Sequence, residues 1–217
     1  MGKRFELIVF DWDGTLLDSA AAIVASIQAA ARDLGLEEPS DERARHVIGL
    51  GLVDALSYAL PDLEPSRYDE VAASYRRHYL AQDGSLSLFG GVDALVRELA
   101  AEHLLGVATG KSRLGLRRAL DQSGLGPYFQ ATRCADECYS KPHPQMLEEL
   151  MAELGVTPSA TLMIGDTTHD MQMARNAGVP ALAVTYGAHG RDQLAAEGPL
   201  ECVAAVADLA AWLRNNS

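Results

Sequence analysis

The stretch that decides the fold is Phe10–Ser19, FDWDGTLLDS, which follows the apolar run FELIV. That compact apolar run predicts a buried strand. Two carboxylates, Asp11 and Asp13, stand one residue apart directly after it. An amphipathic helix is then expected to begin at Asp18 or Ser19. The chain therefore leaves a buried strand through a pair of acids and enters a helix.

The two halves of the chain carry different patterns. From the first helix to about Leu88 only helical periodicity is found, and prolines separate the segments. Beyond Gly91, helices alternate with short apolar strands, a pattern typical of a parallel sheet covered on both faces. The expected strands are 104–110, 128–134, 161–165 and 180–187, and the expected helices are 92–102, 113–123, 144–154 and 168–177.

This contrast predicts the domain organisation. We expect an α/β core domain from residues 1–14 together with 89–217, and an all-helical cap domain from residues 15–88 inserted after the first strand. Ligands of an open parallel sheet bind beyond the carboxyl ends of its strands. The residues expected at those ends are Asp11, Asp13, Thr109, Gly110, Lys111, Ser140, Lys141, Gly165, Asp166 and, slightly further on, Asp170.

Composition limits the partners of this chain. Its 217 residues include 18 Lys and Arg against 30 Asp and Glu, a formal net charge of −12. A surface of that charge repels polyanions, so we expect no nucleic-acid partner. No apolar run reaches membrane-spanning length. Cys134, Cys138 and Cys202 are too sparse for a disulfide framework, and we expect a soluble, cytoplasmic protein.

Carboxylates gathered at one sheet edge repel each other unless a cation lies among them. Oxygen ligands point to Mg²⁺, with Asp11 and Asp166 as the natural side-chain ligands. A carboxylate beside a metal can also attack phosphorus and form an aspartyl-phosphate. Lys141, the Thr109 hydroxyl and the Gly110 N–H are then candidates to neutralise the phosphoryl oxygens.

Asp13 has a separate role in this scheme. It can protonate the leaving oxygen and then act as base on the hydrolytic water, provided that it lies on the other side of the phosphorus from the metal. Taken singly, each of these residues has an ordinary structural explanation; a lone DxD, for example, is more often a turn than a catalytic pair. Their agreement at four strand ends favours phosphate and metal chemistry.

Four motifs resemble those of the haloacid dehalogenase-like hydrolase superfamily. DWDGT, TG after a strand, SKP and GDTTHD occur in the family's order and span nearly the whole chain. The chain is similar to the phosphoglycolate phosphatase-like branch, which carries a helical cap of the C1 type after the first motif. The resemblance implies a Rossmann-like three-layer core, Mg²⁺ as cofactor and a small phosphorylated metabolite as substrate. Phosphoglycolate is the family default, with a sugar phosphate, a nucleotide or pyrophosphate as alternatives.

Carried over by motif, the resemblance implies Asp11 as nucleophile and metal ligand. It implies Asp13 as the general acid and base whose backbone carbonyl also binds Mg²⁺. The remaining implied roles are phosphate binding by Thr109 and Lys141, metal binding by Asp166 and support of the metal by Asp170.

Several activities within the superfamily are separated by single residues. The acid at Asp13 favours a phosphatase over a dehalogenase, because halide leaves without a proton. No Lys occurs between Lys3 and Lys111, so the helical part holds no Schiff-base lysine for a phosphonatase. Trp12 replaces the usual Phe and Gln145 the usual Asp, and neither changes the chemistry. A β-phosphoglucomutase-like mutase and a non-catalytic phospho-ligand sensor remain alternatives.

The helical part offers one candidate for substrate recognition. RARHVIGLGL, residues 43–52, places two Arg, one His and two Gly between helices. Arg45 or His46 is expected to reach an anionic tail of the substrate as the cap closes and excludes water. The alternative is that the arginines only solvate a helix face. The oligomeric state, monomer or dimer, is left open.

Overall fold

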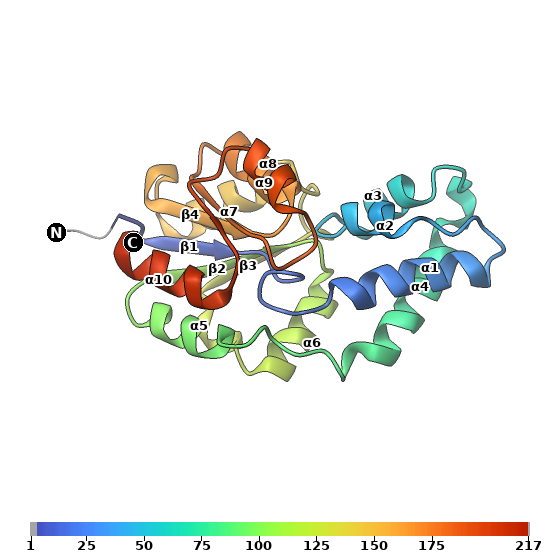
Figure 1. Ribbon diagram of the computed structural model, residues 1–217, viewed down its shortest axis with the longest axis horizontal. Coiled ribbons are helices and arrows are strands. Elements are labelled where there is room, and N and C mark those ends of the chain that lie inside the picture. Colours follow the sequence, from blue (N-terminus) through green and yellow to red (C-terminus); the bar gives the residue numbers. More distant parts are fainter. Residues whose placement is uncertain (1–3, 217) are drawn as a thin grey trace.

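A six-stranded parallel sheet forms the centre of the molecule. The computed structural model describes residues 4–216, and the strands within them lie in the order β3-β2-β1-β4-β5-β6 (Figure 1). All neighbouring strands in this sheet run parallel. The strands are β1 (Leu7–Phe10), β2 (Leu104–Thr109), β3 (Ala131–Cys134), β4 (Thr161–Gly165), β5 (Ala181–Val184) and β6 (Cys202–Val203).

Helices cover both faces of the sheet, which confirms the α/β fold class (Figure 1). None of the helices within residues 4–216 is both long enough and apolar enough to span a membrane. One face carries α5 (Val92–Ala100), α6 (Arg113–Ser123) and α10 (Val206–Asn216), and the other carries α7 (Gln145–Leu154), α8 (Thr168–Asn176) and α9 (Arg191–Ala196).

β1 organises the core because it lies between β2 and β4 and is buried on both sides. Successive side chains of a strand point to opposite faces. Ile8 and Phe10 accordingly join the apolar cluster with α5 and α10, and Leu7 and Val9 join the cluster with α7 and α8. The parallel register brings the ends of β1, β2 and β4 together, so the residues that follow these strands meet at one edge.

Residues 20–83, here called the helical lobe, hold a second apolar core of their own. Ile27 of α1 and Val71 of α4 are among its buried members. The lobe lies beyond the carboxyl ends of the strands (Figure 1). Its helices are α1 (Ala20–Asp33), α2 (Asp41–His46), α3 (Leu52–Ala59) and α4 (Tyr68–Asp83).

The lobe is joined to the core by two segments that run side by side. Leu17 forms an antiparallel bridge with Leu88. The Asp18 N–H donates to the Ser87 carbonyl at 3.0 Å, and the Phe89 N–H donates to the Leu16 carbonyl at 3.0 Å. The chain therefore leaves and re-enters the core at one place, through a narrow double connection.

The sequence pattern and the structure differ at the ends of the strands. β3 begins at Ala131 and not at residue 128, because Gly126–Tyr128 forms a 3₁₀ turn with a proline at its start. β5 is four residues long and ends at Val184. Beyond residue 187 the pattern led to no prediction, and the structure places α9, β6 and α10 there.

Candidate active site

Lys141 stands at the centre of the site, between two carboxylates. Its Nζ lies 2.8 Å from Oδ1 of Asp11 and 2.7 Å from Oδ1 of Asp170. Asp11 follows β1, and its backbone N–H extends the ladder to the Ile164 carbonyl of β4 at 2.9 Å. The side chains of Lys141, Asp11 and Asp170 are all shut off from solvent. Three segments far apart in the sequence thus meet in one dry cluster.

Asp170 is held in place by the start of α8. Thr167 caps this helix, and its hydroxyl accepts from the Asp170 N–H at 3.3 Å. In return, Oδ2 of Asp170 accepts from the Thr167 N–H at 3.0 Å and from its hydroxyl at 2.7 Å. This reciprocal capping box satisfies the free N–H groups of the first turn. It leaves only Oδ1 of Asp170 to face Lys141.

Asp166 is fixed just as firmly at the end of β4. Its Oδ1 accepts from the Thr15 hydroxyl at 2.8 Å, and its Oδ2 accepts from the Ala188 N–H at 2.7 Å. The backbone of Gly14 and Gly187 passes close by, so that a Cβ at either position would lie 2.1 or 2.2 Å from Oδ2. Gly14 also has φ of 79°, a left-handed conformation that favours glycine. Both glycines are therefore required for the carboxylate to lie where it does.

The cluster carries more negative than positive charge. Carboxylate oxygens of Asp11, Asp166 and Asp170 all lie within 4.8 Å of one another. Three carboxylates against the single ammonium of Lys141 leave a formal charge of −2. Within residues 4–216, Oδ1 of Asp11 has only the ion pair with Lys141, and its buried Oδ2 has no partner. A buried carboxylate oxygen without a partner is costly, so the residues present fit a divalent metal with oxygen ligands such as Mg²⁺.

Burial and the excess of negative charge also shift the pKa values of these residues. Burial raises the pKa of Asp11 to about 7; Lys141 opposes this shift and the charge of Asp170 adds to it. Burial, with the charges of Asp11 and Asp170, also raises the pKa of Asp166 well above its ordinary value. For Lys141, burial acts to lower the pKa, but the neighbouring carboxylates outweigh it and hold the pKa above its usual range.

Asp13 faces away from this cluster, toward the helical lobe. Its Oδ1 accepts from the Ser19 hydroxyl at 2.6 Å and lies 3.0 Å from Nζ of Lys111. Lys111 also donates to the hydroxyl of Tyr79 in α4 at 3.0 Å. β1 ends at Phe10, so the two acids lie beyond the strand and need not share one face of it. Asp11 therefore meets Lys141, and Asp13 meets Lys111.

Thr109 and Gly110, the two remaining residues predicted to bind phosphate, lie beneath a loop of the lobe. Thr109 is fully buried, and its hydroxyl accepts from the Lys111 N–H at 3.2 Å. A Cβ at Gly110 would lie 2.4 Å from the Leu50 carbonyl oxygen and 2.6 Å from that of Gly49. The lobe is thus closed on the end of β2, and only glycine allows so close an approach.

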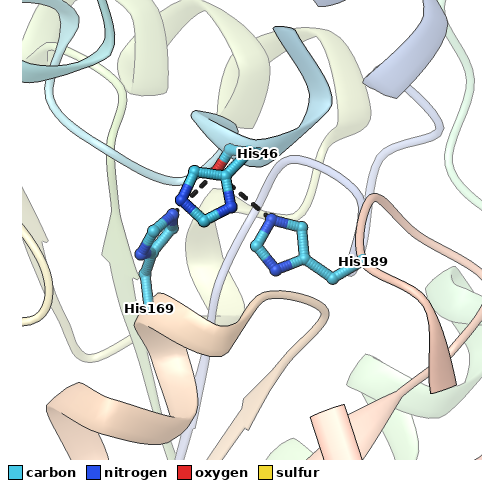
Figure 2. A group of neighbouring side chains, drawn as sticks. All are labelled: His46, His169 and His189. Carbon is cyan, nitrogen blue, oxygen red and sulfur yellow. Dashed lines mark hydrogen bonds between the residues drawn. The ribbon is translucent and has the colours of Figure 1, made fainter. Parts of the chain in front are cut away.

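Two imidazoles of the core hold the lobe in this position (Figure 2). Nε2 of His169 and Nε2 of His189 lie 2.7 and 3.2 Å from the carbonyl oxygen of His46, the last residue of α2. Nδ1 of His189 accepts from the Thr168 N–H at 3.0 Å, so its proton is on Nε2. Burial lowers the pKa of His169, and lowers that of His189 to about 4. Both rings are neutral near pH 7 and donate to one carbonyl.

A cavity of about 530 Å³ opens beside Asp13, between the lobe and the core. Gly110, Lys111 and Ser140 of the core and Tyr79 of the lobe are among the residues that line it. Ser140 also ties the lobe to the core, because its hydroxyl accepts from the N–H of residue 51 at 2.9 Å. The cavity therefore begins where the candidate phosphate site ends.

The two residues predicted to recognise the substrate lie elsewhere. Neither Arg45 nor His46 is among the residues that line the cavity. The His46 ring packs against His169, His189 and Tyr58, with ring centroids 5.0, 5.3 and 4.6 Å apart. The part of His46 that contacts the core is its backbone carbonyl. It lies at the seam, as we call the contact surface between the helical lobe and the core.

Sequence reasoning missed the partners of Asp13. Lys111 was expected at a strand end but was given no function, and Ser19 was considered only as a helix start. Tyr79 lies on a helix whose sequence gave no sign of the site. Tyr79 stands 32 residues before Lys111 in the chain, and only the packing of α4 brings the two side chains together.

Known proteins share this architecture. A hydrolase of known structure from Pseudomonas syringae superposes with a TM-score of 0.88 at 21% identity, covering 97% of this chain and 98% of that one. This likeness is one of fold. Among proteins related in sequence, the Dickeya dadantii protein named "Probable phosphatase IndB" is 38% identical over 200 residues, which are 89% of this chain and 86% of that protein.

A second relative is the phosphoglycolate phosphatase of Synechococcus elongatus. It is 32% identical over 199 residues, covering 89% of this chain and 90% of that protein. The family described as haloacid dehalogenase-like hydrolase matches this chain over residues 8–184, a span that includes all four motifs. The chain therefore belongs to the haloacid dehalogenase-like hydrolases.

Proposed function

We propose that the chain is a Mg²⁺-dependent phosphatase that hydrolyses a small phosphomonoester through an aspartyl-phosphate on Asp11. The observation that carries this proposal is the buried Asp11 carboxylate: its Oδ1 is paired with Lys141, its Oδ2 has no partner within residues 4–216, and it lies close to Asp166 and Asp170. Relatives named as phosphatases support the reaction class.

Three acids would hold the metal, and a fourth would support the site. Asp11 and Asp166 would supply side-chain oxygens, Asp13 its backbone carbonyl, and Asp170 would support the site through Lys141. Bound Mg²⁺ supplies positive charge that offsets the developing charge on the phosphoryl oxygens. The same positive charge favours the ionised form of Asp11, which is the form that acts as nucleophile.

The remaining steps belong to the side chains of this chain. An Asp11 oxygen attacks the phosphorus. Lys141, the Thr109 hydroxyl and the Gly110 N–H neutralise the phosphoryl oxygens. Asp13, oriented by Ser19 and Lys111, gives its proton to the leaving oxygen and later takes one from the hydrolytic water.

The helical lobe would act as a cap domain, with residues 15–88 moving on a core of residues 1–14 and 89–217. The double connection near Leu17 and Leu88 supports this division. Closure would exclude water from Asp11, which is fully buried in the closed form seen here. The three free cysteines support a cytoplasmic location.

Release of p-nitrophenol from p-nitrophenyl phosphate tests the proposal. We expect turnover with Mg²⁺, its loss in EDTA and its recovery when Mg²⁺ is restored. Asp11→Asn should abolish turnover, whereas Asp192→Asn, at an exposed acid of α9, should leave it unchanged. Normal turnover by Asp11→Asn, or by the protein in EDTA, would refute the proposal.

A further inference from the structure

The cavity between lobe and core is placed to receive the leaving group of the substrate. Asp13, the proposed proton donor, and Gly110, a proposed phosphate ligand, both line it. A group bonded to the oxygen that Asp13 protonates must therefore extend into this cavity. The following argument rests on the function proposed above.

The walls of this cavity are apolar to an unusual degree for an exposed surface. Six large hydrophobic side chains are exposed within residues 4–216, and four of them line this one cavity. Those four are Val53, Leu80, Leu114 and Tyr139, with exposures of 64%, 49%, 73% and 69%. Exposed apolar side chains that gather in one place mark a binding surface.

The charged residues of the cavity cancel one another. Three acids and three bases line it, for a formal sum of zero with Asp13 ionised; Asp83, the ion-pair partner of Arg118, adds a fourth acid, so the sum is still zero when Asp13 carries its proton. Lys111 is already paired with Asp13, and Arg118 with Asp83. The cavity therefore has no excess of positive charge to select a second anionic group, such as the carboxylate of phosphoglycolate or the second phosphate of pyrophosphate. The six residues are Asp13, Asp54, Asp136, Arg76, Lys111 and Arg118.

The size of the cavity also favours a substrate larger than phosphoglycolate. Its volume of about 530 Å³ lies within the range of roughly 300–1,000 Å³ found for sites of drug-sized ligands. The two-carbon acid of phosphoglycolate would leave most of this space unfilled. It would also bury none of the apolar wall at the mouth.

We propose that the natural substrate is a phosphomonoester of an alcohol with an apolar body, a chain or a ring, that lies against Leu80 and Leu114. In the first step the Asp11–phosphorus bond forms as the phosphorus–alcohol bond breaks, and the proton of Asp13 goes to the leaving oxygen. In the second step water cleaves the aspartyl-phosphate and returns a proton to Asp13. The products are the alcohol and inorganic phosphate.

A series of ethyl, butyl and hexyl phosphate tests this proposal, because the leaving alcohols differ in length and hardly in chemistry. Burial of each methylene should raise kcat/KM about fourfold, so hexyl phosphate should exceed ethyl phosphate on the order of a hundredfold. Hexyl phosphate should also exceed phosphoglycolate and pyrophosphate. A flat or falling series, or a preference for either of those two anions, would overturn the proposal.

Two variants locate the effect. Leu114→Ser and Leu80→Ser should each lower the ratio of kcat/KM for hexyl over ethyl phosphate several-fold, and both side chains are exposed enough for the fold to tolerate the change. Leu200→Ser is the matched control, since Leu200 is 43% exposed and lies outside the cavity. A wild-type ratio in both cavity variants would also overturn the proposal.

The same assay separates this inference from the proposed function. If ethyl phosphate is hydrolysed, Asp11→Asn abolishes the turnover and the series is flat, only the inference about the leaving group fails. If no ester is hydrolysed, or if Asp11→Asn turns over normally, the proposed function fails and this inference fails with it.

Discussion

The carboxylate cluster and the seam between lobe and core lie close together but are held in place by different kinds of contact. In the cluster, Asp11, Lys141 and Asp170 are dry, fully buried and fixed by strands, a capping box and close glycines. At the seam a few hydrogen bonds, such as those to the His46 carbonyl, hold two separate apolar cores together. The buried charges thus lie in the firmly packed part of the molecule, and the lobe and the core are joined by hydrogen bonds between two separate apolar cores.

Removing the cation of the cluster should have the largest effect. Lys141→Ala removes the only cationic partner of Asp11 within residues 4–216 and leaves Asp170 with only its hydrogen bonds to Thr167, and breaking such a buried pair costs about 3–5 kcal/mol of unfolding free energy. Urea unfolding in EDTA measures this loss, and turnover should also disappear. Added Mg²⁺ should restore part of the stability.

Lys111→Ala gives the matching measurement at the seam. Its partner Asp13 retains the Ser19 hydroxyl, so the loss of stability should be clearly smaller. Equal losses in the two variants would contradict the distinction between a rigid cluster and a loosely held seam.

Closure of the lobe is tested by adding one methyl group. Gly110→Ala would place a Cβ 2.4 Å from the Leu50 carbonyl oxygen, so the lobe must stay open. We expect kcat/KM to fall roughly a hundredfold, the size of effect that a misplaced catalytic geometry produces. The urea midpoint should hardly change, because the contact lies between the two apolar cores.

Gly84→Ala is the control for this closure experiment. A Cβ at Gly84 has no atom within 4 Å, so activity should stay at the wild-type level. Wild-type activity in Gly110→Ala would show that the closed form is not the working one.

The affinity for Mg²⁺ should depend on pH in a defined window. The pKa of Asp11 without metal is about 7, above its ordinary value of 3.8, so below pH 7 a metal must displace the proton. Asp166, whose pKa is also raised, must lose its proton as well, so the apparent Kd should fall at least tenfold per pH unit as pH rises toward 7. Calorimetric titration at pH 5, 6, 7 and 8 measures it, and a Kd constant over this range would contradict the burial argument.

The smallest effect is expected at the aromatic side of the seam. Tyr79→Phe removes the hydroxyl that accepts from Lys111 at 3.0 Å but keeps the ring and its packing. The loss is worth about 0.5–1.5 kcal/mol, so kcat/KM should fall about twofold to tenfold. A change beyond that range would mean that Tyr79 contacts the reacting group itself.

Much of the core site was readable from the order of residues along the chain. Asp11, Thr109 and Asp166 each stand at the end of an apolar run, and parallel strands bring such ends together. Asp170 follows three residues after Thr167, which is the spacing of a capping box. Of the late elements, β6 escaped prediction because it has only two residues, too few for a periodic pattern, whereas α10 buries Val206, Leu209, Ala210 and Leu213 at a helical spacing that the sequence does carry.

The contacts between lobe and core could not be predicted from the sequence in this way. Substrate recognition by Arg45 and His46 stays a prediction from their residue types, whereas the seam contact that the structure shows is made by the backbone carbonyl of His46, and every residue has one. Tyr79 and Leu114 line the same cavity, although their helices pack in separate apolar cores. No local signal marks such pairs, because their meeting depends on how the lobe lies on the core.

The sequence by itself determined the parallel sheet, the order of the motifs and the residues that gather at the strand ends, because strand and helix periodicities are local properties. Only the tertiary structure decided that Oδ2 of Asp11 is left without a partner within residues 4–216, that Asp13 turns to Lys111, and that an apolar cavity lies beside it. Those features arise from contacts across the fold, where burial and distance are set by packing and not by spacing along the chain.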